Sequence, residues 1–267
     1  MSPAARHEIF ISGVQFDHEL RSGAMSVLEL APIALRWGAE GVEYREVYWK
    51  NRASELPAIR DQLARLGIKA TFATFTTLYN SDPERQKQLM RDLEDARTLG
   101  APLMRVFRGE RPGTSPEGSA MRDAARAVVD RARDLGLRLA LENFSGLPGS
   151  RPEEIQEVLE ILDSPVMGVN VDFANYVGNG VDPIAATQRL APWIVYAHLK
   201  DQRATPQGKV NSFLGSGTLP LPEILAALEA TGRDFPFCFE FQGEADPEGG
   251  IAASMAYLAD LGLARGR

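Results

Sequence analysis

The sequence predicts an α/β protein that folds as a single (β/α)8 barrel over residues 1–267. Short apolar runs alternate along the chain with longer segments of helical character, a pattern typical of parallel strands joined by crossover helices. Eight such pairs can be counted, and eight is the number that closes a barrel of about this length. The apolar share of 44% is enough for a large core without disulfides or a structural metal.

An open, doubly wound sheet is the alternative fold for the same alternation. A sheet of that kind usually has a glycine-rich fingerprint directly after its first strand. The corresponding segment, SGVQFDHELRSG (12–23), has no such fingerprint. The chain also shows no linker or low-complexity tract that would separate a second domain, so we expect one closed barrel.

The strands and helices can be placed from apolar pattern and end signals. The expected strands are 9–16, 41–47, 69–75, 102–109, 137–143, 167–175, 194–201 and 237–243. The expected helices are 26–38, 53–66, 83–99, 118–135, 152–163, 182–191, 220–231 and 250–264. At the helix over 83–99, Ser81 or Asp82 can cap the start, and Pro83 suits the first helical position. Gly100 then provides a stop.

Composition argues against several classes of protein. A net charge of −7 does not suit a protein that binds nucleic acid, which needs clustered Lys and Arg. A single cysteine, Cys238, allows neither an internal disulfide nor a cysteine-based zinc site. No apolar run approaches the roughly 20 residues that cross a bilayer, and residues 1–8, MSPAARHE, do not resemble a signal peptide. We therefore expect a cytoplasmic protein that binds neither nucleic acid nor membranes.

Each of the last four expected strands ends on a side chain that can bind a metal ion. The C-terminal ends of the strands of a barrel, with the loops beyond them, build its active site. The four side chains are therefore expected to meet at one end of the barrel. They are Glu142 in LALEN, Asp172 in VNVDFAN, His198 in VYAHLKD and Glu240 in FCFEFQG.

Strand alternation gives these four side chains a common inward direction. Residues two positions apart on a strand share a face, so Ala140 points the same way as Glu142. By the same rule Tyr196 accompanies His198. The positions between them, such as Val171, are apolar throughout, as an outer face covered by helices requires.

A shared metal ion explains why carboxylates end such apolar strands. Three carboxylates in one buried mouth would repel one another, which would raise their pKa values. One divalent cation provides all three with a counter-charge. Oxygen ligands with one imidazole suit Mn²⁺, Mg²⁺ or Co²⁺ better than a structural zinc, and we expect one ion, Mn²⁺ first among these. A lone carboxylate or histidine at a strand end is more often structural, whereas four in consecutive strands indicate a joint site.

These motifs resemble those of the xylose-isomerase-like superfamily of sugar isomerases and epimerases. The resemblance extends from GAEGVEYR (38–45) to FEFQG (239–243) and includes LALEN, VDFAN, AHLKD and the segment from LGSGT (214–218) onward. It implies one divalent metal bound by the four side chains Glu142, Asp172, His198 and Glu240. In ketose 3-epimerases of this type the two glutamates also form the acid–base pair, which here implies catalytic roles for Glu142 and Glu240.

The chain departs from the family pattern at Asn175. Many relatives have a histidine at this position, three residues after the metal-binding aspartate. An amide can hydrogen-bond a substrate hydroxyl but cannot carry a proton at neutral pH. The related AP endonucleases bind three zinc ions through several histidines. Only His198 is well placed here, so that DNA-repair activity is not expected.

The expected substrate is a small sugar or polyol ketone, or the corresponding aldehyde. A metal ion would polarise its carbonyl, and a carboxylate would remove the proton from the neighbouring carbon to give an enediolate. Reprotonation yields an epimer or an isomer, whereas loss of a β-hydroxyl yields a dehydrated product. We predict an isomerase or epimerase. A lyase that dehydrates a keto-cyclitol or keto acid, and a non-catalytic sugar-binding barrel, are the alternatives.

Further polar and aromatic side chains near the strand ends are candidate substrate contacts. These are Asn175, Lys200, Arg203, Glu43, Trp49 and Arg105. Of Glu43 and Arg45, only one is expected to face inward. Trp49 either packs on the apolar face of a sugar or packs within its loop.

Two features bear on whether the substrate is charged. Arg105 and Arg108 would favour an anionic substrate. The stretch GSGT (215–218) is a candidate phosphate loop because it precedes a helix, although we favour a tight turn. Barrels of this family commonly form dimers or tetramers, so the resemblance also implies a homo-oligomer.

Overall fold

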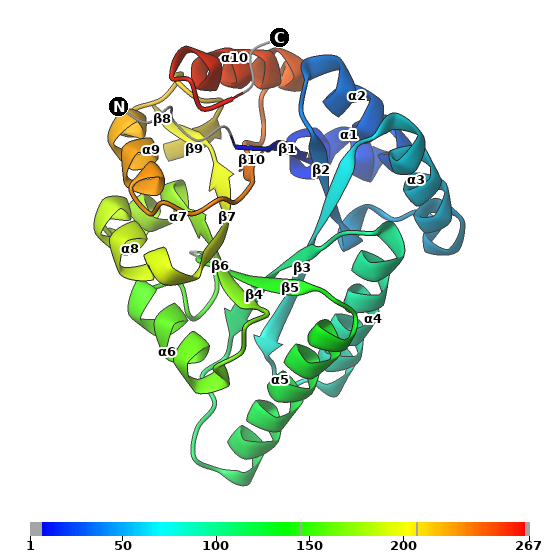
Figure 1. The fold of residues 1–267 in the computed structure, drawn as a ribbon, viewed down its shortest axis with the longest axis vertical. Coiled ribbons are helices and arrows are strands. Elements are labelled where there is room, and N and C mark those ends of the chain that lie inside the picture. The colour runs from blue at the N-terminus through cyan, green and yellow to red at the C-terminus, as the bar shows by residue number, and fades with distance from the viewer. Residues whose placement is uncertain (1–6, 145, 207, 265–267) are drawn as a thin grey trace.

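The computed structural model describes residues 7–144, 146–206 and 208–264. Eight parallel strands close into a barrel in the order β1-β10-β7-β6-β5-β4-β3-β2, and helices surround it (Figure 1). The predicted barrel is thereby confirmed. Residues 1–6, which include most of the segment tested for a signal peptide, lie outside the described part. No helix in the described ranges is long and apolar enough to span a membrane.

All eight expected strands and all eight expected helices overlap elements of the structure. The barrel strands are β1 (Ile9–Ser12), β2 (Gly41–Arg45), β3 (Lys69–Tyr79), β4 (Leu103–Gly109), β5 (Arg138–Glu142), β6 (Met167–Asp172), β7 (Ile194–Leu199) and β10 (Phe237–Phe239). The helices are α1 (Asp17–Ser22), α2 (Leu30–Trp37), α3 (Arg52–Leu66), α4 (Pro83–Leu99), α5 (Pro116–Asp134), α6 (Pro152–Leu162), α7 (Phe173–Gly178), α8 (Pro183–Leu190), α9 (Leu221–Glu229) and α10 (Pro247–Asp260).

Capping side chains explain where several elements begin and end. Asp82 caps α4 by accepting a hydrogen bond from the Glu84 amide at 2.9 Å, as the sequence pattern predicts. The strand expected over 167–175 is shorter than predicted. It ends at Asp172, because this carboxylate accepts a hydrogen bond from the Asn175 amide at 3.0 Å and caps the short helix α7.

Side-chain alternation divides the apolar residues into two cores. A small cluster fills the barrel interior and consists of Phe10, Leu103, Ala140, Val195, Tyr196 and Cys238. A much larger cluster lies between the barrel and its helices and includes Val169, Val171 and Leu199. The inward positions of Ala140 and Tyr196 confirm the predicted phase of β5 and β7, which sets the direction of Glu142 and His198.

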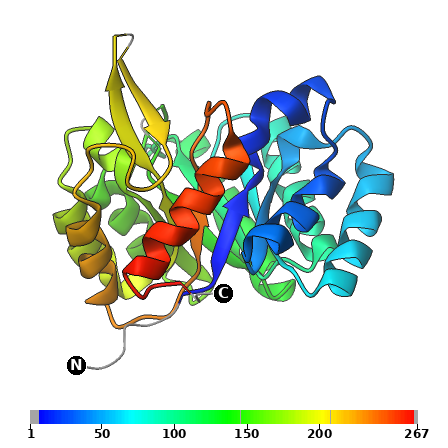
Figure 2. The same cartoon turned by 90° about the horizontal axis from the view of Figure 1, so that it is seen from above.

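A two-stranded hairpin follows β7 and was not predicted. It consists of β8 (Asp201–Thr205) and β9 (Gly208–Ser212), which pair antiparallel and project beyond the barrel (Figure 2). At its base the buried Asp201 carboxylate accepts hydrogen bonds from the amides of Gly217 at 2.9 Å and Leu219 at 3.0 Å. These amides are therefore already paired, so the stretch 215–218 is a tight turn and does not present them to a phosphate.

Candidate active site

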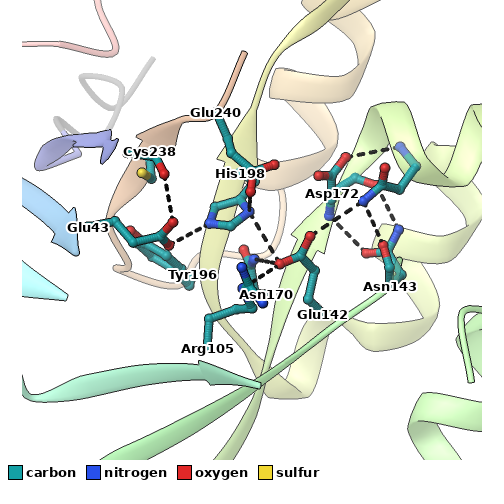
Figure 3. Close-up of polar contacts among 12 residues, drawn as sticks. Glu43, Arg105, Glu142, Asn143, Asn170, Asp172, Tyr196, His198, Cys238 and Glu240 are labelled. Carbon is teal, nitrogen blue, oxygen red and sulfur yellow. Dashed lines mark hydrogen bonds and ion pairs between the residues drawn. The ribbon is translucent and has the colours of Figure 1, made fainter. Parts of the chain in front are cut away.

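The four predicted metal-binding side chains converge at the carboxyl ends of their strands. Glu142, Asp172 and His198 lie on β5, β6 and β7, and Glu240 directly follows β10. All four are buried, and each offers one ligand atom within 4.8 Å of the others (Figure 3). Strands of a parallel barrel carry their carboxyl ends to the same rim, which brings together side chains far apart in the sequence.

Asn143 fixes the spacing between two of these strand ends. Its side-chain amide donates to the Asp172 carbonyl at 2.7 Å, and its side-chain oxygen accepts from the Asp172 amide at 2.9 Å. Both groups are fully buried. The asparagine of LALEN therefore pairs the backbone of β6 and holds Asp172 beside Glu142.

Three buried cationic side chains contact the carboxylates. Arg105 Nε lies 2.8 Å from Glu142 Oε2. Lys200 Nζ lies 2.5 Å from both Asp172 Oδ2 and Glu240 Oε2, and Arg45 pairs with Glu240. The described cluster thus contains positive charges that offset much of the repulsion among its carboxylates, a contribution that the strand-end pattern in the sequence did not indicate.

The pKa values of the carboxylates differ with their neighbours. Burial raises the pKa of Asp172 to about 7, and the nearby Glu240 and Glu142 add to the effect of burial against the opposing charge of Lys200. Burial also acts to raise the pKa of Glu240. There His198, Lys200 and Arg45 outweigh burial, so the pKa of Glu240 falls well below its usual range. Glu240 is therefore ionised at neutral pH.

The imidazole of His198 has one nitrogen paired and one without a hydrogen bond. Nε2 lies 2.7 Å from Glu43 Oε2. Nδ1 is fully buried and makes no hydrogen bond, although it lies 3.2 Å from Glu240 Oε1 and 3.4 Å from Glu142 Oε2. A buried polar atom rarely lacks a partner. A bare Nδ1 among carboxylate oxygens is the donor set that a divalent cation requires, so the residues fit a metal ion.

A pocket of about 200 Å³ opens beside the cluster. Its polar lining includes Glu142, Glu240, Arg45 and Lys200. Its apolar lining consists of Val14 and an aromatic wall made of Phe75, Phe107 and Phe144. Ring centroids are 5.9 Å apart between Phe75 and Phe107, and 5.2 Å apart between Phe107 and Phe144. A pocket with one charged side and one aromatic side suits a small polyol, which has hydroxyl edges and C–H faces.

A larger cavity of about 930 Å³ lies at the opposite, amino-terminal end of the barrel, next to Phe10, Lys69 and Arg138. None of the predicted site residues lines it. The converging carboxylates are all at the other rim, and we therefore identify the smaller pocket as the candidate active site.

The candidate substrate contacts divide into those that line the pocket and those that do not. Asn175, Lys200 and Arg105 line it. Trp49 instead stacks near Tyr44 and Phe72, with ring centroids 6.3 Å and 6.2 Å away, on the outer side of the barrel wall. Its alternative role in loop packing is the one that its position supports.

Two further candidates also stand apart from the pocket. Arg203 forms an ion pair with Glu244 at 2.9 Å and does not line the pocket. Arg108 is buried and lies 3.8 Å from Glu154, away from the pocket lining. Neither position supports a direct contact with substrate.

The expectation that only one of Glu43 and Arg45 faces inward is wrong. The two residues are two positions apart on β2 and so share a face. Both are buried, and Arg45 Nη2 donates to Glu43 Oε1 at 3.1 Å. Arg45 lines the pocket, whereas Glu43 lies behind His198.

Fold and site together define a TIM barrel with a candidate metal centre at the carboxyl ends of its strands. Residues 32–261 match the family described as "Xylose isomerase-like TIM barrel". The chain belongs to that family, as the sequence motifs predict.

Relatives of the chain divide between epimerases and dehydratases. It is 30% identical over 185 residues to 2-epi-5-epi-valiolone 7-phosphate 2-epimerase of Actinoplanes sp., with 67% of this chain and 66% of that protein covered. It is 22% identical to inosose dehydratase of Bacillus thuringiensis, with 79% of each covered. A third match, 29% identical, covers 40% of this chain and 38% of an uncharacterized protein of Methanocaldococcus jannaschii.

Solved structures share the fold at low identity. The structure of L-ribulose 3-epimerase aligns with a TM-score of 0.75 and 16% identity, covering 96% of this chain and 94% of that one. At this identity the likeness concerns the barrel alone.

Proposed function

We propose that the chain is a metal-dependent epimerase of a small sugar or polyol ketone, which moves a proton at the carbon next to the carbonyl. The observation that carries this proposal is the convergence of Glu142 and Glu240 on one pocket, from β5 and from the end of β10. Two carboxylates from different strands can reach a substrate from two sides, as inversion at carbon requires.

The proposed metal ligands are Glu142, Asp172, His198 and Glu240. Their three carboxylates and one imidazole favour Mn²⁺, with Mg²⁺ or Co²⁺ as alternatives. Such an ion supplies Lewis-acid polarisation of the substrate carbonyl.

The two glutamates are proposed to exchange the proton. Glu240 is ionised and can accept a proton from carbon, and its ion pairs with Arg45 and Lys200 hold its orientation. Arg105 orients Glu142 in the same way. Asn175 lines the pocket, and its Nδ2 donates to the Asn143 carbonyl at 2.9 Å and to Glu142 Oε1 at 3.4 Å. Its Oδ1 is therefore the atom that can accept a hydrogen bond from a substrate hydroxyl.

The size and lining of the pocket support a small substrate. A volume of about 200 Å³ is below the roughly 300–1,000 Å³ of common ligand sites. The aromatic wall can pack against the C–H face of one sugar or cyclitol, while the charged side binds its hydroxyls. We propose a single small ring or short-chain ketose and not an oligosaccharide.

Dehydration is the second candidate, because the match to inosose dehydratase covers 79% of this chain. A dehydratase must protonate the departing hydroxyl. Lys200, which lines the pocket, is the cation placed to do so. We favour the epimerase because the match to an epimerase has 30% identity, against 22% for the match to inosose dehydratase.

Incubation with Mn²⁺ and a panel of keto-polyols in D₂O tests the proposal. An epimerase produces a diastereomer that contains deuterium at the inverted carbon and retains all its hydroxyls. A product with one hydroxyl fewer assigns the dehydratase. Absence of deuterium exchange and of turnover with every keto-polyol contradicts both activities and favours a binding protein.

A further inference from the structure

The carboxylate of Glu43 contacts the imidazole of His198 from another part of the barrel wall, behind the proposed metal site. Glu43 lies on β2 and His198 on β7, and β1 and β10 separate these strands in the barrel. Nevertheless Glu43 Oε2 lies 2.7 Å from His198 Nε2, and both side chains are fully buried (Figure 3). The contact must therefore form through the barrel interior.

The second oxygen of Glu43 is fixed by two donors. Oε1 accepts a hydrogen bond from Ser12 Oγ at 2.9 Å and another from Arg45 Nη2 at 3.1 Å. These two hydrogen bonds fix the plane of the Glu43 carboxylate. Its Oε2 therefore stays directed at His198. The ion pair with the Arg45 guanidinium favours the ionised form of Glu43, which can only accept hydrogen bonds.

An acceptor at Nε2 determines the tautomer of a neutral imidazole. Nε2 must then carry the proton, which leaves the lone pair on Nδ1. That lone pair points to the space between Glu142 and Glu240. Outer-shell carboxylates that orient a metal-binding histidine in this way commonly affect metal affinity.

We infer that Glu43 is a positioning residue that holds His198 as the Nε2–H tautomer, with Nδ1 directed at the metal ion. The inference rests on the metal site of the proposed function. It replaces the expectation that Glu43 contacts substrate, because Glu43 does not line the pocket and its two oxygens are already paired.

A second metal ion is the competing interpretation of the same residues. Glu43, His198 and Cys238 also offer three ligand atoms within 4.8 Å of one another. An ion bound there would need the lone pair of His198 Nε2, however, while the proposed metal ion takes the lone pair of Nδ1. A neutral imidazole has only one nitrogen free to bind a metal ion, so the two sites exclude each other.

The Glu43→Gln variant separates these interpretations. Ser12 and Arg45 both donate to Oε1, so the glutamine oxygen would occupy that position and its NH₂ group would face His198. The amide then donates to Nε2, which moves the imidazole proton to Nδ1 and blocks the metal-binding lone pair. We expect Mn²⁺ to bind about 10–100-fold more weakly, measured by calorimetry.

The chain contains a matched control at the other end of the molecule. His7 Nε2 lies 2.5 Å from Glu229 Oε1, so Glu229→Gln makes the same chemical change at a Glu–His pair remote from the site. This variant should bind Mn²⁺ as the unaltered chain does. Unchanged affinity in Glu43→Gln, or two ions per unaltered chain, would overturn the inference while leaving the proposed metal site in place. Failure of the unaltered chain to bind Mn²⁺ would overturn both.

An NMR measurement on the unaltered chain does not depend on whether a variant folds. Only three histidines are present, so ¹⁵N-histidine spectra with Cd²⁺ as a diamagnetic probe will be simple. The inference requires His198 to carry its proton on Nε2 and to bind Cd²⁺ through Nδ1. A proton on Nδ1, or Cd²⁺ bound through Nε2, would contradict it.

Discussion

Glu240 has more positive neighbours than any other carboxylate that lines the pocket. Arg45, Lys200 and His198 all lie within ion-pair distance of it. These contacts hold the carboxylate in one orientation and keep it ionised. A group held in this way is suited to accept a proton from carbon without first reorganising its surroundings.

Replacing Glu240 tests its proposed catalytic role. Glu240→Gln keeps the shape of the side chain but removes the base, so we expect kcat to fall by about 10²–10⁴-fold. Glu244→Gln is the matched control, because Glu244 pairs with Arg203 outside the pocket. Rates of deuterium exchange for both variants provide the measurement. Near-normal exchange in Glu240→Gln would exclude this residue as the base.

Asn143 offers a test of how the rim is held together. Asn143→Ala would leave the buried amide and carbonyl of Asp172 without these partners. Each unpaired buried group costs about 1–3 kcal/mol, so the free energy of unfolding should fall by about 2–6 kcal/mol in urea titrations. Asn211→Ala, at a half-buried position on β9, should cost much less because the Asn211 side chain accepts one hydrogen bond, from Gln202 at 3.3 Å. Equal losses of unfolding free energy in the two variants would argue against a stabilising role for the two Asn143–Asp172 hydrogen bonds.

At the scale of elements, an irregularity in β3 shapes the pocket. The register with β4 shifts between Ala73 and Thr77. Phe75, within the shifted segment, stays 39% exposed and lines the pocket. Asp92 of α4 supports the segment by accepting a hydrogen bond from Thr74 Oγ1 at 2.6 Å, and the Thr74 carbonyl accepts one from Arg105 at 2.6 Å.

This support predicts a specific pH dependence of stability. Burial raises the pKa of Asp92 from 3.8 to about 6, although Thr74 opposes the shift. The folded state therefore binds the proton of Asp92 more tightly than the unfolded state does. Protonated Asp92 contributes its full stabilisation of the fold below about pH 4. This contribution to the free energy of unfolding, on the order of 3 kcal/mol, is lost as the pH rises through about 6.

Comparison of the unaltered chain with Asp92→Asn isolates this contribution. The asparagine cannot ionise, so the variant should gain stability relative to the unaltered chain between about pH 4 and pH 7. Chemical denaturation at several pH values measures the difference. A difference that is constant over this range would contradict the raised pKa.

The sequence predicts the regular elements well because their signals are local. Asp82 and Pro83 mark the start of α4 within a few residues, and alternation gives the direction of Glu142 on β5. The irregular parts depend on contacts between distant residues. The shift in β3 needs Asp92 from the following helix, and the base of the β8–β9 hairpin needs Asp201 to pair with Gly217. No local sequence pattern predicts either contact.

The candidate site is predictable to the same degree. Its four proposed ligands follow from strand ends that share a rim, and the convergence of these side chains agrees with that expectation. The sequence does not predict the hydrogen bond between Glu43 and His198, because it crosses the barrel between strands that are not neighbours. The position of Trp49 was left open because its neighbours, such as Phe72, come from another strand.

For the molecule as a whole, binding of a metal ion should appear as thermal stability. A ligand that binds only the folded state at 100 times its Kd adds about 2.7 kcal/mol. For a chain of this size, that corresponds to a rise in Tm of about 5–10 °C. Thermal scans with Mn²⁺ and with EDTA should differ by this amount. Identical Tm values would contradict a metal site at these residues.

The ion pairs of Arg45, Arg105 and Lys200 have a consequence for how the protein is assembled. Because the carboxylates have counter-ions of their own, the chain does not need a bound cation to complete its barrel. We therefore expect folding and loading of the proposed metal ion to be separate events, so that the folded chain can exchange one ion for another. The ion bound at the proposed site would then follow the supply of free metals at the time, and not those present when the chain was made.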